Sequence, residues 1–324
     1  MTDTLTLTRG AEAAGVRARA GRGRSGAGRP PWQEPPTVVG QAAKGLTLAG
    51  VLAAVLVPIW IIVVTSFSTP GAINRAGGLV IWPDGLTVEP YHEMLSDPTV
   101  RTSLLVSLGI TLVGTAISMA VSVMCAYGLS RPRSFAHRFL LLLLIVTMFV
   151  NGGLIPTFLV VTDLGGYGKY WALILPNAVS VFNILVLRSF YSETAGELID
   201  AARIDGAGDW RILWSVVLPT SRAVTAVVAL FYAVGYWNSF FNVMLYMPTD
   251  SQKWPLQYVL LTYVNRGVGL PGSVNAGFGS AHAQTAPLSL QMAVVVLTLI
   301  PLLIVYPFVQ KHFRTGVLTG AIKG

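Results

Sequence analysis

Charged residues are scarce in this chain. Only 11% of its 324 residues are Asp, Glu, Lys or Arg, whereas soluble domains carry about 25%. Hydrophobic residues make up 53%, and the mean hydropathy is +0.63. Because so few charges cannot cover a surface that faces water, the composition excludes an ordinary soluble domain and predicts a membrane protein.

Cysteine is nearly absent, and so is any glycine-rich cradle for nucleotide phosphates. Cys125 is the only cysteine, which excludes a disulfide within the chain. The only lysine that follows a glycine is Lys169, and a tyrosine comes next, so the pattern G-x-x-x-x-G-K-[ST] is missing. The sequence therefore predicts no ATP hydrolysis by this chain, no catalytic residue, no cofactor and no metal site.

Long apolar runs without charges are what the chain does contain. A helix needs about 20 apolar residues to cross the hydrocarbon core of a bilayer. These runs do not alternate between polar and apolar residues, which favours helices over strands. We therefore expect an all-α, polytopic membrane protein with six transmembrane helices. The expected spans are 45–68, 102–130, 139–162, 170–187, 223–249 and 288–310.

Basic residues are distributed unevenly between the two sides of these spans. Seventeen of the 22 Lys and Arg residues lie before the first span, in the second and fourth connecting loops, and after residue 310. Cytoplasmic loops carry an excess of Lys and Arg, so both termini are predicted to be cytoplasmic, in the plasma or inner membrane. Residues 1–44 should form a disordered basic tail and residues 311–324 a second tail. Topology thus explains the basic excess, and no nucleic acid partner is needed.

Ionisable residues are missing from the expected spans. Ion-coupled transporters usually keep Asp, Glu, Lys, Arg or His within the membrane, so a secondary transporter is disfavoured and any transport should be driven by a partner. A polytopic membrane transferase is another alternative. It would need paired carboxylates or clustered histidines near the membrane, yet the acids of the predicted cytoplasmic loops all fall in one loop. They are Glu193, Glu197, Asp200, Asp205 and Asp209.

This loop, residues 192–219, joins the fourth and fifth spans. Four apolar residues, Ile199, Ala201, Ala202 and Ile204, lie among charges, which suits a short helix on a surface or in a groove of another protein. Gly206 and its neighbour Gly208 would allow a turn that residues with a Cβ resist.

The residue order of this loop resembles the EAA loop of ABC importer permeases. Asp200-Ala201-Ala202 is followed after three residues by Gly206, after nine more by Val216, and then by Leu218-Pro219. Asp replaces the usual Glu, and Val the usual Ile, which keeps the charge and the branching. The resemblance implies a coupling helix that docks on an ATPase subunit, although Arg203 and Asp205 could simply be solvated. The implied docking residues are Asp200, Ala201, Ala202, Arg203, Asp205, Gly206, Leu218 and Pro219.

Two further stretches, FYAVGYWNSFFNVMLYM and HFRTGVLTGAIKG, are similar to carbohydrate-uptake permeases of the maltose-permease type. The similarity is greatest to the subgroup for oligosaccharides and polysaccharide fragments, and it extends from Thr102 to Gly324, with a core at 102–310. It implies a type I importer fold and a non-catalytic subunit that carries a carbohydrate. The implied partners are a second, usually different permease subunit, two ABC ATPase subunits, an extracytoplasmic solute-binding protein and membrane lipid. Another solute, such as a polyamine or amino acid, is the alternative.

Aromatic and amide residues of the fifth span are candidates for the substrate pathway. They are Tyr232, Tyr236, Trp237, Asn238 and Asn242. The two tyrosines lie four residues apart, as do the two asparagines, so each pair should share a helix face. Such residues could bind sugar, or they could pack against neighbouring helices. The same alternatives hold for Asn151, Asn177, Asn183 and Gln291.

Three further expectations concern kinks and ends. Pro176 and Gly152–Gly153 could kink the fourth and third spans, or they could be adaptations to packing. The maltose-type resemblance implies that Gly267–Gly279, in the external loop 248–287, could reach into the binding protein, although a passive connector is equally compatible. It also implies that Gly316–Gly324 could contact the ATPase subunits, although a frayed cytoplasmic end is the alternative.

Overall fold

The computed structural model describes residues 37–131, 135–150, 152–194, 196–266 and 287–320. The chain divides into two units, residues 1–57 and 58–324. In the described part of the first unit the chain is helical from Val38 onward. Across the described ranges the fold is all-α, with a single isolated antiparallel bridge between Ser68 and Leu86.

Three helices are long and apolar enough to cross a membrane without a break. They are α2 (Val38–Ser66), α5 (Pro98–Leu129) and α16 (Pro287–Gly320), the last over Leu288–Pro307. The start of α5 is well defined because the Asp97 side chain accepts a hydrogen bond of 2.7 Å from the Thr99 amide, and proline occupies the first helical position.

The other three predicted spans are each divided. The third consists of α6 (His137–Phe149) and α7 (Leu154–Asp163), and the chain breaks at Gly153, whose φ is +86°. The fourth contains α8 (Trp171–Ile174), η1 (Leu175–Asn177) and α9 (Val181–Thr194), with a bend of 50° just after Pro176. The kinks predicted at these two places are confirmed.

A bend also precedes the fifth span. A helical run formed by α11 (Asp209–Ile212), the π-helical η2 (Leu213–Val217) and α12 (Leu218–Thr220) meets α13 (Arg222–Trp237) at 87°. If each bent pair counts as one crossing, the described residues contain up to six spans.

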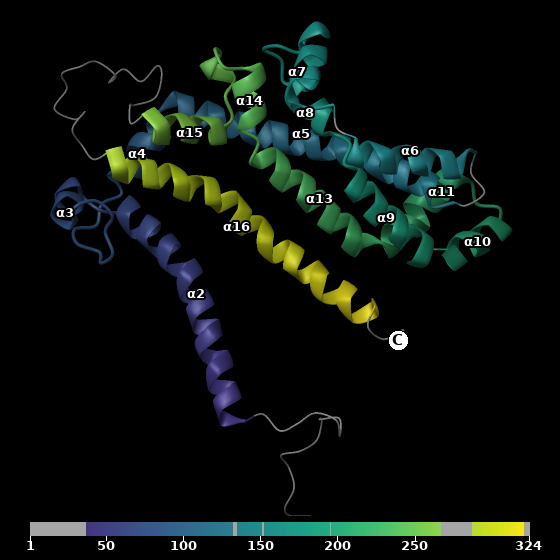
Figure 1. Cartoon of the computed structure of the whole chain (residues 1–324), viewed down its shortest axis with the longest axis horizontal. Coiled ribbons are helices and arrows are strands. Elements are labelled where there is room, and N and C mark those ends of the chain that lie inside the picture. The colour runs from purple at the N-terminus through teal and green to yellow at the C-terminus, as the bar shows by residue number, and fades with distance from the viewer. Residues whose placement is uncertain (1–36, 132–134, 151, 195, 267–286, 321–324) are drawn as a thin grey trace, which may run out of the picture. The chain divides into compact units, whose positions relative to one another are not determined.

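The core of the second unit lies around α5 and α13, which run side by side (Figure 1). Helix α9 also packs on α5, and α16 packs on α13. The buried face of α5 carries small residues, which allow neighbouring backbones to approach closely. These residues are Ser103, Ser107, Gly114, Ser118 and Ser122.

Short helices that the sequence analysis did not predict connect the spans. Between α2 and α5 lie α3 (Pro70–Ala76) and α4 (Glu89–Ser96). After α13 come α14 (Phe241–Tyr246), η3 (Ser251–Lys253) and α15 (Leu256–Arg266). Helix α15 occupies part of the predicted external loop 248–287 and packs on α5 and α16. The segment Gly267–Gly279 lies outside the described residues.

Two helix ends differ from the predicted boundaries. Helix α2 begins at Val38, inside the segment expected to be a disordered tail up to residue 44. Helix α16 continues to Gly320, beyond the expected end of the last span at residue 310. A charge-based boundary marks where a helix leaves the hydrocarbon, whereas a helix can continue into water until a breaking residue or an unfavourable contact ends it.

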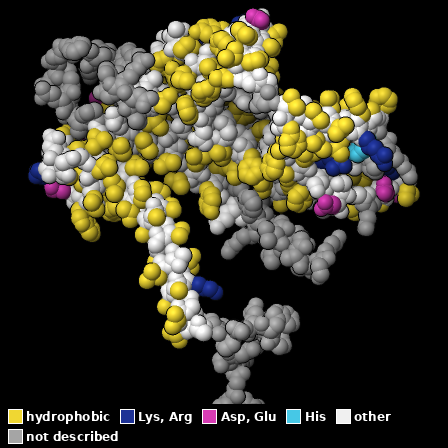
Figure 2. All heavy atoms as spheres, viewed as in Figure 1, with side chains coloured by type: hydrophobic (Ala, Val, Ile, Leu, Met, Phe, Trp, Pro, Cys, Tyr) yellow, Lys and Arg dark blue, Asp and Glu magenta, His cyan; other side chains and the backbone are white. Residues whose placement is uncertain are grey.

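The surface of the second unit is largely hydrophobic (Figure 2). Leu105, Leu112 and Phe149 keep 68%, 69% and 81% of their surface exposed. On the face shown, basic, acidic and histidine side chains gather at the end formed by α6, α11 and α10 (Gly196–Ile204). Large exposed hydrophobic side chains are expected where a surface meets lipid or another subunit.

Candidate functional site

The predicted docking loop begins with α10, which ends in a Schellman motif. The Gly206 amide donates to the Arg203 carbonyl at 3.0 Å, and the Ala207 amide donates to the Ala202 carbonyl at 2.9 Å. Gly206 adopts a φ of +80°, a conformation that side chains disfavour, and Ala202 and Ala207 pack together against the core. Gly208 has an ordinary φ of −73°, so the turn depends on one glycine and not on both.

The side chains of α10 divide into an inner and an outer face. Ile199 is buried and Ala202 half-buried, whereas Ala201 is exposed and Ile204 is 88% exposed. The charged candidates Asp200, Arg203 and Asp205 are also exposed, and Asp200 and Arg203 form only a loose ion pair of 3.8 Å. The structure thus brings five candidates together at one exposed tip, Asp200, Ala201, Arg203, Asp205 and Gly206.

Leu218 and Pro219 lie apart from this tip. They are half-buried in α12, immediately before α13, and Leu218 packs against the hydrophobic core. Their position supports a structural part in the loop, because the chain turns there from α12 into α13. The exposed apolar residue of the tip is instead Ile204.

The loop is fastened to the end of α5 by residues that the sequence analysis did not identify. Arg131 donates to an Asp209 carboxylate oxygen at 2.8 Å, and its guanidinium lies 4.1 Å from the centre of the Tyr127 ring. The Tyr127 hydroxyl donates to the Asp209 carbonyl at 3.2 Å. Arg131 and Asp209 are far apart in sequence, so only the fold reveals that α11 is attached to α5.

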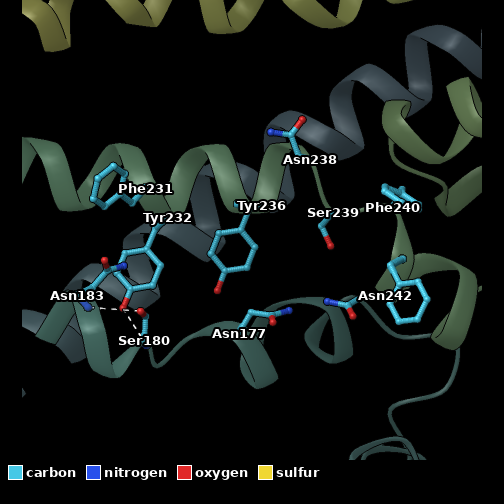
Figure 3. Close-up of a pocket in the computed structure, with 12 residues that line it drawn as sticks. Asn177, Ser180, Asn183, Phe231, Tyr232, Tyr236, Asn238, Ser239, Phe240 and Asn242 are labelled. Atoms are coloured by element: carbon cyan, nitrogen blue, oxygen red, sulfur yellow. Dashed lines mark hydrogen bonds between the residues drawn. The ribbon is translucent and has the colours of Figure 1, made fainter. Parts of the chain in front are cut away.

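A cavity of about 380 Å³ lies at the other end of α13 (Figure 3). Its walls come from the bend between η1 and α9, from α13, and from the link between α13 and α14. Amides, hydroxyls and aromatic rings line it, and none of its lining side chains is charged. The lining residues are Asn177, Ser180, Asn183, Phe231, Tyr232, Gly235, Tyr236, Asn238, Ser239, Phe240, Phe241 and Asn242.

The two tyrosines share a face of α13, as predicted, but their hydroxyls are occupied. The Tyr232 hydroxyl pairs with Ser122 Oγ at 2.7 Å and accepts from the Ser180 amide at 3.1 Å. The Tyr236 hydroxyl pairs with Ser118 Oγ at 2.8 Å and lies 3.0 Å from the Ile174 carbonyl oxygen. These bonds join α13 to α5 and to the bend before α9, so the rings form the cavity wall while the hydroxyls hold helices together.

Asn238 and Asn242 do not share a helix face, contrary to the prediction. Helix α13 ends at Trp237 and α14 begins at Phe241. The Asn238 side-chain amide donates a hydrogen bond of 3.0 Å to the Val234 carbonyl. Such a side-chain bond to the backbone competes with the hydrogen bonds that would continue the helix. Both asparagines nevertheless line the cavity.

Trp237 lies outside the cavity lining, although it was a pathway candidate. It is 3% exposed, and its indole nitrogen donates to the Thr298 carbonyl of α16 at 3.1 Å. Asn177 and Asn183, which the sequence singled out only weakly, do line the cavity. Gln291 is absent from the lining, and Asn151 lies outside the described residues.

Comparison with known proteins identifies relatives along most of the chain. The polygalacturonan/rhamnogalacturonan transport system permease protein YtcP of Bacillus subtilis is 40% identical over 81% of this chain and 91% of its own length. Protein LplC of the same organism is 40% identical over 86% of this chain and 93% of its own.

A solved structure is also similar. One chain of a bacterial ABC transporter involved in the import of the acidic polysaccharide alginate superposes with a TM-score of 0.79 at 28% identity. The match covers 88% of this chain and 100% of that one. Residues 113–319 match the family described as binding-protein-dependent transport system inner membrane component, and they include α10, α13 and the cavity. The chain therefore belongs to this family of ABC importer permeases.

Proposed function

We propose that this chain is one of two permease subunits of a binding-protein-dependent ABC importer and forms half of the pathway for an oligosaccharide. The observation that carries the proposal is the exposed tip of α10, which is held in shape by Gly206 and fastened to the membrane-spanning helix α5 through Asp209. A chain that carries no ATPase of its own needs such a contact to receive the energy of ATP hydrolysis.

The proposed topology has six spans and cytoplasmic termini. The bent helix pairs of the third and fourth spans each supply one span and α13 supplies the fifth, and the excess of Lys and Arg supports a cytoplasmic position for the loop 192–219. The tip of α10 would then face an ATPase subunit, with Ala201 allowing close approach and Ile204 offering an apolar contact. Gly316–Gly324, of which the last four residues lie outside the described part of the chain, would contact the ATPase dimer. An extracytoplasmic binding protein would deliver the solute to the opposite side.

The chain itself offers a route for the coupling motion. A shift of α10 is carried through Gly206 into α11 and, by way of α12, into α13, whose tyrosines wall the cavity. The Arg131–Asp209 ion pair passes the same shift to α5. Both routes end at the Tyr232 and Tyr236 hydrogen bonds, so docking at one end would alter the cavity at the other.

An oligosaccharide is favoured by the cavity lining and by the relatives. Asn177, Asn183, Asn238 and Asn242 offer amides for hydroxyl groups, and aromatic rings offer flat apolar faces. A polyamine would need carboxylates in the lining, and an amino acid would need both acidic and basic side chains. The residues that line the cavity include no charged side chain. Two relatives, the polygalacturonan/rhamnogalacturonan permease and the alginate importer, also transport polysaccharides.

The experiment that tests docking is purification of the tagged chain from gently solubilised membranes, followed by identification of the bound proteins. A second permease subunit and an ATPase should co-purify with the wild type. Gly206→Val and Ala201→Leu should lose the ATPase, because one distorts the turn and the other adds bulk to the exposed tip. Ala120→Leu, an equal enlargement at an exposed alanine of α5, should retain it.

Full retention of the ATPase by both loop variants would refute docking through α10. The solute is tested separately by uptake into vesicles that contain the complete importer and its binding protein. Oligosaccharides should be taken up and should stimulate ATP hydrolysis. Stimulation by polyamines or amino acids alone would overturn the carbohydrate assignment while leaving the docking result intact.

A further inference from the structure

The helical run Asp209–Thr220 exposes two tryptophans that packing within the chain does not use. Trp210 and Trp214 lie four residues apart, and each keeps 66% of its surface exposed. The opposite side of the run is buried, with Ile212 and Val217 at 0% exposure. We propose that these two tryptophans anchor the run in the lipid headgroup region of the membrane. Helices α11 and α12 then lie along the bilayer surface, next to the exposed tip of α10.

The direction of the run supports this position. It meets α13 at 87°, and α13 packs along α5, a helix long and apolar enough to cross the bilayer unbroken. A segment at nearly a right angle to a spanning helix lies along the membrane plane. Its two-sided character, one face against protein and one bearing aromatic rings, is that of a helix at an interface.

The depth of the run follows from the charges of α5. Arg101 and Arg131 bracket the uncharged residues 102–130, which at 1.5 Å per residue extend about 44 Å. A bilayer with its headgroup regions is about 40–45 Å thick, so Arg131 lies among headgroups. Asp209 is bound to Arg131 at 2.8 Å, which places Trp210 at the same depth. Tryptophan is enriched at this level because its ring is apolar and its N–H is polar.

The tryptophan face also continues the surface that α5 presents to lipid. Met124 of α5 is 48% exposed, and Met124 and Trp210 border the same hollow of about 350 Å³. Arg211, between the two tryptophans, is exposed and can attract lipid phosphates. Asp209, the acid next to Trp210 in the chain, is already paired with Arg131. Apolar continuity and positive charge both match a lipid surface.

The test measures the proximity of lipid at the two positions in the assembled importer. In a cysteine-free complex that carries Cys125→Ser, Trp210→Cys and Trp214→Cys are labelled with bimane and reconstituted in bilayers. The bilayers contain lipid with a nitroxide on the headgroup or in mid-chain. Ile204→Cys, at the exposed tip of α10, is the matched control. The inference depends on membrane insertion and not on docking through α10.

Headgroup nitroxide should diminish bimane fluorescence at 210 and 214, more than mid-chain nitroxide does, with little loss at 204. Adding or removing the ATPase subunits should leave the signals at 210 and 214 unchanged. Absence of quenching, or quenching that the ATPase subunits abolish, would overturn the proposal and assign the face to a protein partner. If the tryptophan variants do not assemble, Ser215→Cys reports on the same exposed run.

Discussion

The wall of the cavity depends on the Tyr236 hydroxyl and on the absence of a side chain at Gly114. The Tyr236 ring lies against Gly114 of α5, where an added Cβ would stand 2.9 Å from three of its ring carbons. The same tyrosine holds Ser118 and the Ile174 carbonyl through its hydroxyl. Gly114 therefore sets how closely α13 can approach α5, and so fixes the wall of the cavity.

Gly114→Ala should destabilise the protein by about 1–3 kcal/mol, the usual range for overpacking a tight contact. The new methyl group must push the Tyr236 ring away from its two hydrogen-bond partners. The measurement is the thermal unfolding midpoint of the purified importer. Gly109→Ala is the control, because an added Cβ there meets nothing within 4 Å. Equal midpoints for the two variants would show that the close packing at Gly114 is unimportant.

Asn242 is the asparagine best suited to test the cavity as a substrate pathway. It is half-buried in the lining at the start of α14. Asn242→Ala should raise the KM for oligosaccharide uptake and leave ATPase co-purification unchanged, because it removes an amide from the cavity and touches no part of the docking loop. Gln252→Ala, at an exposed residue outside the cavity, should have no effect. An unchanged KM in Asn242→Ala would argue for a packing role.

At the scale of elements, the loop between α9 and α13 consists of two helices with different surroundings. Helix α10 presents an exposed tip, whereas the run Asp209–Thr220 buries one side in the core and is fastened to α5. The Schellman turn at Gly206 separates them. Any force applied to the tip must pass through this turn, so its backbone conformation matters as much as the tip's side chains.

Substitutions at Gly206 can separate conformation from steric access. Gly206→Val should weaken coupling strongly, since a β-branched residue resists a φ of +80°. Gly206→Asn should retain most ATPase binding and transport, because asparagine tolerates that conformation. Both variants are compared by co-purification and uptake. If Asn is as damaging as Val, the partner requires the absence of a side chain rather than the turn.

The contact between α11 and α5 should depend on Arg131. Arg131→Met removes the ion pair with Asp209 and the stacking on Tyr127, so hydrogen exchange of the amides at 209–212 should become faster. Arg138→Met makes the same change of charge at an exposed position of α6 and serves as the control. Unchanged exchange in Arg131→Met would mean that apolar packing alone holds α11.

The single chain leaves many large hydrophobic side chains exposed. Its surface exposes large hydrophobic residues between ends where charges gather (Figure 2). The chain has a cavity wall and an exposed tip at α10, and it belongs to a family of ABC importer permeases. Lipid and the second permease subunit would cover the exposed apolar side chains.

The proposed orientation predicts opposite accessibility of two exposed sites. In a Cys125→Ser background, a membrane-impermeant maleimide should label Gln252→Cys in intact cells. It should label Ser192→Cys only after the membrane is made permeable. The physical basis is that the side proposed to carry Ser192 holds seventeen of the 22 Lys and Arg residues, whereas the side proposed to carry Gln252 holds five. Labelling of Ser192→Cys in intact cells would invert the topology.

Sequence alone determined the features that depend on local composition. The membrane environment, the all-α fold and the family followed from charge-free runs and from the spacing of Asp200, Ala201, Ala202 and Gly206. Apolar length and motif spacing act over short stretches of chain, so they can be read without a structure. The kinks at Gly153 and Pro176 followed for the same reason.

The tertiary structure decided everything that depends on which distant residues meet. The Arg131–Asp209 pair, the tyrosine bonds from α13 to α5, and the bond that holds Trp237 on α16 and outside the cavity lining all involve partners more than 50 residues apart. The break after Trp237 likewise separated Asn238 from Asn242 and still left both in one cavity. Periodicity predicts which residues share a face of an ideal, straight helix. Where a helix bends, and which neighbours each face contacts, is decided only when the chain packs.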